Sequence, residues 1–429
     1  MLCGAPDDVC GNLAPGMLSL MAMLSPKHRW TRNTLRLVPL VWLGVGCASP
    51  RASLRHATAE SSGSTLVSAE PLREVSGPMR WFERGVVALQ QGEPARAVAL
   101  LSRYLGAEVT DPSLDVYPVL ARAHEELGDC NAAIRAYTTY LGAAKGSADR
   151  GDIFARRGAC EAETLQWARS AASYAQARSA SGPGMLPSEE IERLARGGYA
   201  LYTLGEDKQS EALLVAVDAV LVRAQNTEEE RFSTYYFVGM ARFYRAALLH
   251  RRFRAIHIRP SRDQMAADFQ RKLDLLAAAQ VAYNHTISAK HVYWVSAAGY
   301  QLGALFEEFY DALMYAPVPS WLRSSQRNTY YEELKKQLRP VVNKAIWVFE
   351  KNLETARRLG YSNNFTEQTQ ARLSELQAIL LASDTRLGEP TPHFSKGIDP
   401  EIDPDQGNQD YLSLPAQERR LFVPRPTPL

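Results

Sequence analysis

The chain has 429 residues, a formal net charge of +2 and 46% hydrophobic residues. A nearly neutral chain lacks the basic excess of proteins whose main partner is nucleic acid, which disfavours that class. Strand signals are sparse, and the middle is rich in Ala, Leu, Arg, Glu and Gln, which helices prefer. The length allows one large core or an extended array of small cores.

The N-terminus carries a targeting pattern. A basic segment from Lys27 to Arg36 precedes the apolar run LVPLVWLGVG at residues 37–46, which ends at Cys47. The run is shorter than the roughly 20 residues that span a membrane, and the pattern is typical of a secretory signal. A Cys directly after Val-Gly resembles a bacterial lipoprotein signal, in which that Cys is acylated, although Gly44 stands where Leu is preferred. We interpret residues 1–47 as a lipoprotein signal with lipidation at Cys47; the alternative is a plain secretory signal cut nearby.

Two further expectations follow from this region. A start at Met23 would give a signal of normal length, so Met23 is a candidate for the true start. The residue after Cys47 is Ala48 and not Asp, which by the same resemblance implies that the protein is anchored in the outer membrane and faces the periplasm. Residues 48–77 are rich in Ser, Ala, Thr and charge and lack aromatic residues. Such a composition cannot bury enough apolar area to order itself and predicts a flexible linker.

Residues 111–141 predict two short amphipathic helices that meet at Gly128. Tyr117 and Ala121 share one face of the first helix, and Ala133 and Tyr137 lie four apart on the second. Small residues that face each other let two helices approach closely, and an aromatic residue then fills the groove beside them. This pattern resembles a tetratricopeptide repeat (TPR), a helical hairpin of 34 residues.

One hairpin cannot bury its apolar face alone, so neighbours are expected. The same order of residue types occurs upstream at Trp81, Gly85, Gly92 and Ala97, and downstream at Phe154, Gly158, Ser170 and Tyr174. Arg84 and Arg157 stand where Leu is usual, and the downstream copy has no glycine at its turn. We predict an all-α, TPR-like helical-hairpin solenoid over residues 78–384; the alternative is an ordinary helical bundle.

The residues expected to pack the repeats share small or aromatic side chains at these positions. They are Trp81, Gly85, Ala97, Tyr117, Ala121, Ala133, Tyr137, Gly158, Gly303 and Ala345.

The cysteines that follow the predicted signal are few. Cys130 starts the second helix of one repeat and Cys160 lies late in the first helix of the next, so stacking could bring them together. A disulfide in an oxidising periplasm and two buried thiols are both open interpretations. The spacing does not suit a zinc site.

The middle of the chain continues as helices. Glu189–Leu204 and Lys208–Ala224 predict a degenerate fourth repeat, because Ala212 lies farther from Gly205 than the corresponding alanine does elsewhere. A basic run follows, and it includes Arg245, Arg251, Arg252 and Arg254. It could be a docking patch for an acidic partner, an anionic glycan or phospholipid headgroups; the plainer interpretation is a solvated helix end and loop.

From residue 265 the pattern predicts a long helix, a break and a second long helix. Gly303 marks the first helix of a repeat whose partner is expected at Ala345 and Phe349. Between them we predict an insertion that contains Pro-Val-Pro and a separate helix at residues 330–338, forming a rigid protrusion. Gly360 is expected to end the partner helix.

This block resembles repeat proteins of gliding and predatory Gram-negative bacteria. The residues that carry the resemblance are Ala282-Tyr283, Trp294, Ala298, Leu302-Gly303, Phe309, Leu313, Pro317-Val318-Pro319, Lys344-Ala345, Leu353 and the Gly360 to Thr366 turn. With the lipoprotein signal, the chain is most similar to the TPR lipoproteins of the adventurous gliding motility machinery, over about residues 78–384. The resemblance implies an outer-membrane scaffold whose partners are envelope proteins of a gliding complex.

Residues 385–429 are proline-rich with little apolar periodicity, which predicts a disordered tail. Motifs for catalysis are lacking: there is no phosphate loop, no nucleophile elbow and no His-Glu-x-x-His. His285 and His291 are spaced poorly for one metal, and the adjacent pair Glu307-Glu308 is expected on a solvated face.

We therefore predict a non-catalytic periplasmic scaffold, without cofactor, metal, nucleic acid or small-molecule substrate, that binds protein partners of an envelope complex. The alternative function is an outer-membrane protein or envelope-polymer assembly lipoprotein. An enzyme is the third class, and no motif favours it.

Overall fold

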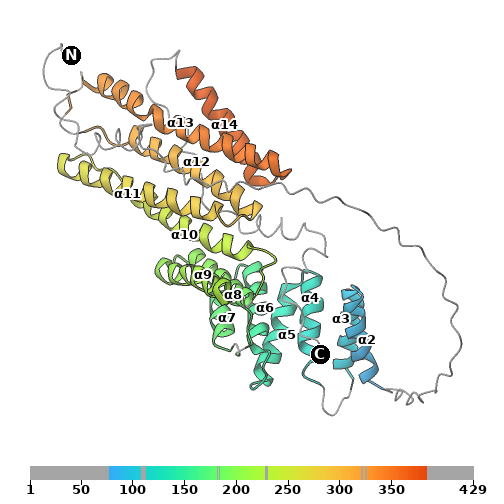
Figure 1. Cartoon of the computed structure of the whole chain (residues 1–429). Helices are drawn as coiled ribbons and strands as arrows, with labels where there is room; N and C mark the ends of the chain where they lie inside the picture. The colour runs from blue at the N-terminus through green and yellow to red at the C-terminus, as the bar shows by residue number, and fades with distance from the viewer. Residues whose placement is uncertain are drawn as a thin grey trace, which may run out of the picture.

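The computed structural model describes residues 77–107, 113–180, 182, 184–227, 230–319, 322–323 and 326–383. These ranges form helices joined by turns, with no strand among them, which confirms the predicted all-α class. The helices are α2 (Met79–Gln90), α3 (Pro94–Leu105), α4 (Val116–Glu126), α5 (Cys130–Ala143), α6 (Arg150–Glu163), α7 (Trp167–Ser179), α8 (Pro187–Thr203), α9 (Asp207–Thr227), α10 (Tyr236–Ala255), α11 (Arg262–Ile287), α12 (Val292–Met314), α13 (Arg327–Leu359) and α14 (Asn364–Ser383) (Figure 1).

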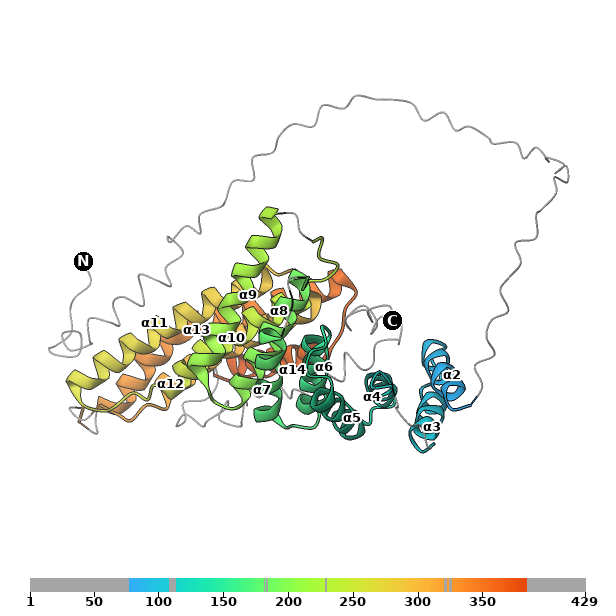
Figure 2. The ribbon, with the colours of Figure 1, turned by 90° about the horizontal axis from the view of Figure 1, so that it is seen from below.

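Successive helices pack as hairpins. The pairs are α2–α3, α4–α5, α6–α7, α8–α9, α10–α11 and α12–α13, and α14 packs on the last pair. Each second helix also contacts the first helix of the next hairpin, so the pairs stack into one array. The short helices α2 to α8 occupy one end, and the longer helices α10 to α13 run together at the other (Figure 2). Cys47, residues 48–76 and the tail 385–429 lie outside the described residues.

Within a hairpin, a small residue on the first helix faces a large one on the second. A Cβ atom built on Gly85 would lie 2.7 Å from the Leu101 side chain, and one on Gly158 would lie 3.1 Å from the Tyr174 ring. The same relation joins Gly198 to Leu214, at 2.6 Å. Any larger residue at these glycines would push the two helices apart, so the small residues set how closely each hairpin packs.

The turn between the two helices is left-handed in each of the first four hairpins. Gly92, Gly128 and Gly205 have φ of 77°, 76° and 79°, and Leu165 takes the same place with φ of 59°. The absence of a turn glycine between α6 and α7 therefore does not change the hairpin. A leucine is tolerated there because the helices on both sides are fixed by packing, which outweighs the local preference.

The fourth hairpin is more regular than predicted. Ser210 lies as far behind Gly205 as Ala133 does behind Gly128, and its hydroxyl donates to the Gly198 carbonyl at 2.7 Å. Ser170 makes the matching bond to the Gly158 carbonyl at 2.8 Å. Serine is small enough for the crossing point, so the expectation that Ala212 marks this position was wrong.

The apolar core is divided into three clusters. One joins α2, α3 and α4 around Leu101 and Tyr104, a second joins α4 to α7 around Tyr137 and Phe154, and a third extends from α8 to α14. Burial of the C-terminal helices is the most extensive, as expected for helices that pack on several sides. None of the helices in the described ranges combines the length and apolarity needed to cross a membrane.

The predicted insertion is partly wrong. The separate helix expected at residues 330–338 is instead the start of α13, a continuous helix with Pro340 inside it. Proline normally interrupts a helix, but Leu338, Val341 and Ala345 are buried on either side of it and hold the segment in register. Gly360 ends the helix in a left-handed conformation, as predicted.

Replacing Leu165 by glycine is expected to raise the free energy of unfolding by up to about 1 kcal/mol. A leucine at positive φ costs roughly 1–2 kcal/mol, and the greater freedom of glycine in the unfolded chain cancels part of the gain. Leu165 is 57% exposed, so little apolar contact is lost. Urea unfolding measures the change. The matched control Leu204→Gly, at φ of −74°, should lower stability instead; equal effects would contradict the strain argument.

Ala133→Leu is expected to lower the melting temperature of the array. Ala133 and Ala121 are fully buried in the second core cluster, where the two helices of the hairpin cross. Overpacking of a core typically costs about 1–3 kcal/mol. Circular dichroism melts should show the loss for Ala133→Leu but not for Ala175→Leu, whose position on α7 is exposed. Identical melts would show that the assigned register is wrong.

Candidate binding surface

The first helices of the hairpins form the inner row of the array. α2 contacts α4, α6 contacts α8, and α8, α10, α12 and α14 continue the row. The second helices make no contacts of comparable extent with one another among the described residues. The array therefore curves toward the first helices, and in stacked hairpin proteins the inner side is the usual binding surface.

Charged side chains link α4 to α6 on this inner row. Arg156 donates to Glu125 at 2.9 Å, and the Tyr137 hydroxyl donates to the same carboxylate at 2.9 Å. The side chains of Arg156 and Glu125 are only 11% and 21% exposed. Burial raises the pKa of Glu125, and the two donors act against that rise. The two donors therefore hold the partly buried Glu125 carboxylate in one orientation.

The charges continue across α6 and α8. Arg193 is buried on α8 and bonds Asp152 on α6, while Glu192 and Arg196 pair within α8 at 2.8 Å. Burial raises the pKa of Glu192, and the nearby charges of Arg196 and then Arg156 lower it. Acidic and basic groups therefore follow one another along α4, α6 and α8. We call this set of Glu125, Arg156, Asp152, Arg193, Glu192 and Arg196 the inner charge line.

Aromatic rings join the next pair of first helices. Tyr199 on α8 and Tyr244 on α10 lie with ring centroids 4.4 Å apart, and Tyr202 lies 5.1 Å from Tyr244. Arg251 stacks on the Tyr202 ring at 3.8 Å, and Arg196 stacks on Phe237 at 5.0 Å. The inner row thus changes from charged to aromatic contacts between α8 and α10.

The predicted basic patch on α10 is not a free basic surface. Arg251 pairs with Asp207 at 2.7 Å and Arg252 with Glu211 at 2.5 Å, both on α9, and Arg245 lies 3.8 Å from Asp218. The carboxylates of the preceding hairpin neutralise these arginines. These pairs help to hold α10 on α9, while the side chains of Arg245, Arg251 and Arg252 stay 39%, 34% and 37% exposed.

Arg254 belongs to a more buried network with α12. Its guanidinium donates to both oxygens of Glu308, at 2.7 and 2.5 Å, and His250 lies 3.1 Å from Glu308 and from the Tyr283 hydroxyl. These partners hold the pKa of Glu308 at about 2 against the effect of burial, whereas burial lowers the pKa of His250. The network fixes α12 against α10 and α11.

The two candidate disulfide cysteines are near each other but free. Cys130 and Cys160 are buried thiols. The Cys130 thiol donates to Glu163 at 2.7 Å, and the Cys160 thiol lies 3.6 Å from Glu125. A hydrogen bond with Cys130, together with burial, raises the pKa of Cys160. The structure therefore shows the thiol form of the two alternatives.

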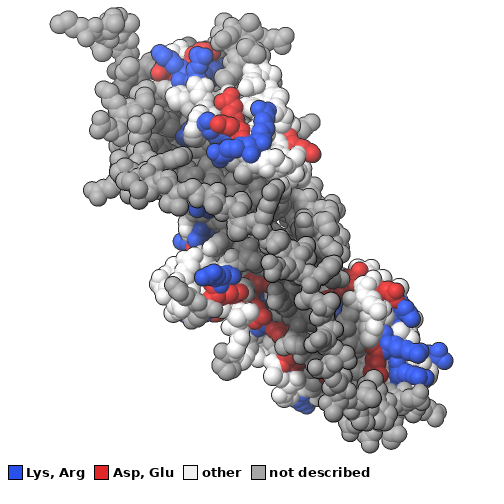
Figure 3. All heavy atoms as spheres, turned by 45° about the vertical axis from the view of Figure 1, so that its right-hand side comes forward, with Lys and Arg blue, Asp and Glu red and all other residues white. Residues whose placement is uncertain are grey.

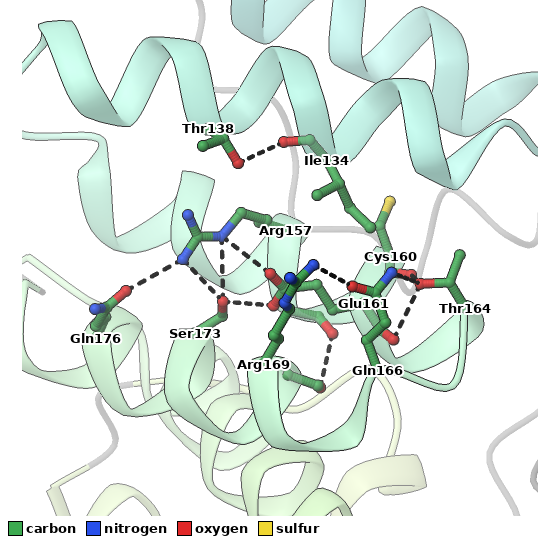
Figure 4. A network of polar contacts seen from close by, with 12 residues as sticks. Ile134, Thr138, Arg157, Cys160, Glu161, Thr164, Gln166, Arg169, Ser173 and Gln176 are labelled. Atoms are coloured by element: carbon green, nitrogen blue, oxygen red, sulfur yellow. Dashed lines mark hydrogen bonds and ion pairs between the residues drawn. The ribbon is translucent and has the colours of Figure 1, made fainter.

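Arg157 occupies the usual leucine position and is satisfied by polar partners (Figure 4). Its guanidinium donates to Ser173 at 3.1 Å and to Gln176 at 3.2 Å, and it lies 3.4 Å from Glu161. The Ser173 hydroxyl donates to Glu161 at 2.6 Å. A polar network between α6 and α7 therefore surrounds Arg157, beside the close contact of Gly158 with Tyr174. Arg84, the other such departure, is exposed.

The expectation of a solvated Glu307-Glu308 face was wrong. Glu307 is buried, neither of its carboxylate oxygens has a hydrogen-bond partner in the described part, and Arg372 on α14 lies 3.5 Å away. Burial raises the pKa of Glu307 to about 8 and that of neighbouring Asp311 to about 7. Two acids one helical turn apart therefore share the interface between α12 and α14.

The remaining predicted packing residues lie inside the array. Ala97 and Ala345 are fully buried, and a Cβ atom on Gly303 would lie 2.1 Å from the Phe349 ring. Trp81 and Tyr117 are half-buried against the first cluster. The inner charge line was missed from sequence, because two of its ion pairs, Arg156 with Glu125 and Arg193 with Asp152, join residues one hairpin apart.

Within the described residues, no group of three or more His, Cys, Asp or Glu side chains is arranged to hold a metal ion. Glu125 and Glu308 are bonded to arginines, and His250 lies between Glu308 and the Tyr283 hydroxyl.

No protein-family model and no curated protein matches the chain. Among solved structures, the C-terminal part of a TPR repeat-containing protein from Cytophaga hutchinsonii is 11% identical, with a TM-score of 0.36, covering 69% of this chain and 95% of that one. A tetratricopeptide repeat protein from Parabacteroides merdae is 13% identical, with a TM-score of 0.33, covering 70% and 98%. Similarity at this level assigns no function, and the fold rests on the helix packing described above.

The buried acids predict that stability decreases as pH rises. The folded-state pKa values of Glu307 and Asp311 lie above the ordinary 4.5 and 3.8. Their contribution to the free energy of unfolding is therefore fully present below about pH 4 and decreases as the pH rises to about 8. Arg372 and Glu375 face them from α14, and Glu308 lies beside them. Each unit of pKa difference corresponds to about 1.4 kcal/mol.

Glu307→Gln should remove much of this dependence, because a neutral amide need not lose a proton. Urea unfolding at pH 5.5 and 8.5 should show a smaller difference for Glu307→Gln than for the unaltered chain. The exposed Glu350→Gln, on α13, serves as the control and should keep the original difference. A Glu307→Gln chain with an unchanged difference would show that Glu307 is ionised in the folded state.

Proposed function

We propose that the chain is a non-catalytic scaffold that binds protein partners along the inner row of its first helices. The observation that carries this proposal is the inner charge line, in which acids and bases alternate across α4, α6 and α8, with Glu125, Asp152 and Arg196 partly exposed. Rigid hairpins hold these groups in place before a partner arrives, so little side-chain freedom is lost on binding. Charges of alternating sign also favour a partner with the complementary pattern over other sequences.

We further propose that acylated Cys47 holds the scaffold at the outer membrane, facing the periplasm, within an envelope complex of the gliding motility type. Support comes from the signal pattern that ends at Cys47 and from the resemblance of residues 78–384 to the TPR lipoproteins of that machinery. An extended or helical segment of an envelope protein would lie along the inner row. The surface it covers would run across several hairpins, so the affinity would be distributed over many contacts.

The scaffold is tested by capture of partners from cross-linked membranes, followed by mass spectrometry. Arg156→Glu should lose the partners that the unaltered chain captures, because it places a second acid beside Glu125. Exposed Arg135→Glu, on the outer side of α5, is the control. The double exchange Glu125→Arg with Arg156→Glu keeps an ion pair and guards against simple unfolding; it should fold yet bind less. Equal capture by all variants would exclude the inner charge line as the binding surface.

Cys47 is expected to be the only site of fatty-acid incorporation. A labelled fatty-acid analogue should be incorporated into the unaltered chain and not into Cys47→Ala, which should move from the membrane to the soluble fraction. Incorporation that persists in Cys47→Ala would rule out the lipid anchor. The partner-binding proposal would remain, because capture by the inner row does not depend on acylation.

A further inference from the structure

The outer face of α2 is basic and exposed. Arg80, Glu83, Arg84 and Val87 share this exposed face at helical spacing, and Val87 is 47% exposed. Gly85, Ala88 and Leu89 on the opposite face are buried against the array. As the first helix of the first hairpin, α2 has no preceding hairpin among the described residues to cover this face.

The second helix of the hairpin extends this surface. The Arg103 guanidinium on α3 lies 4.4 Å from the centre of the Trp81 ring, and exposed Met79 begins α2. Arg96 is neutralised by Glu93 at 2.8 Å, whereas Arg80, Arg84 and Arg103 have no acidic partner in the described part of the chain. Figure 3 shows basic side chains at this end of the array, at the lower right, with acidic side chains beside them. We call Met79, Arg80, Trp81, Arg84, Val87 and Arg103 the α2 surface.

The composition of the surface distinguishes it from the other arginine clusters. The arginines of α10 are paired with carboxylates of neighbouring helices, which neutralise their charge. The α2 surface instead has a net positive charge, because Arg80, Arg84 and Arg103 outnumber Glu83 and form no ion pair with it, and it adds the half-buried Trp81 ring and exposed Met79 and Val87. That combination suits a membrane interface, where arginine meets lipid phosphate and the apolar side chains reach the boundary of the acyl chains.

Its position in the chain points the same way. Residues 48–76 separate Cys47 from the first described residue, and their composition predicts a flexible linker. A flexible chain of this length has an end-to-end distance of about 30 Å. A chain acylated at Cys47 would therefore hold its first hairpin close to the lipid surface, and would keep it there at high effective concentration.

We propose that the α2 surface docks on the anionic headgroups of phospholipids and so orients the array with its first hairpin against the membrane. The inference rests on the proposed anchor for its biological setting, but the surface itself does not need acylation to bind lipid. Docking leaves α4, α6 and α8 free, so the inner charge line stays open to partners. Two contacts, one acyl chain and one basic surface, then hold the scaffold more firmly than either does alone.

The test uses the mature chain from Ala48, which carries no acyl group, and flotation with phosphatidylethanolamine vesicles made with or without phosphatidylglycerol. We expect binding only to the anionic vesicles, and weaker binding at high salt. Arg80→Glu with Arg84→Glu should reduce the affinity more than tenfold, since each basic residue near an anionic surface contributes roughly fivefold. The control pair is Arg135→Glu with Arg357→Glu, two exposed arginines on other hairpins, which should change it little.

Three results would overturn the proposal: no binding to anionic vesicles, an equal loss in the control pair, or equally tight binding to soluble polyphosphate. The last would show that the surface binds phosphate without requiring a lipid surface. Circular dichroism melts of both variants would separate lost binding from lost folding. If the chain from Ala48 fails to bind vesicles while the full chain still incorporates fatty acid at Cys47, the α2 surface is rejected and the proposed anchor stands.

Discussion

The close approach of two helices at a glycine is the contact on which the rest of the array depends. At Gly158, the helix backbone itself meets the Tyr174 ring, and Gly85 and Gly198 meet leucines in the same way. This contact fixes the thickness of each hairpin. Because the next hairpin packs on that thickness, it also fixes the distance between successive first helices. The pairing of Arg156 with Glu125, one hairpin away, is possible only at that distance.

The hairpin register was predictable because it is local. Small residues, a turn and an aromatic recur at fixed spacing around Ala121, Ala133 and Tyr137, and these residue types have few other reasons to recur together. The failures have physical causes. Leu165 and Ser210 fill positions where glycine and alanine are usual, and packing on both sides makes them acceptable. Pro340 does not end a helix, because buried residues on either side hold α13 in place.

The charges were predicted least well, for a related reason. A run of arginines along one helix looks like a surface when only neighbours in sequence are considered. Arg251 finds its carboxylate 44 residues away and Arg254 finds its own 54 residues away, and nothing local marks the partner. Buried Glu307 was missed in the same way, since its neighbour α14 comes much later in the chain. Once the hairpin register is known, the helices that face these arginines and Glu307 can be identified, and with them the charged partners.

The division of the apolar core has a mechanical consequence. In a stacked array the stability is distributed over single hairpins and their interfaces with neighbours, so the array need not open as one cooperative unit. If the chain is held at its N-terminal end and loaded by a partner farther along, tension passes first through the small cluster of α2 to α4. That hairpin can unravel and lengthen the connection while the large cluster of α8 to α14 keeps its shape. The first hairpin would then extend under tension and limit the force that reaches the other hairpins.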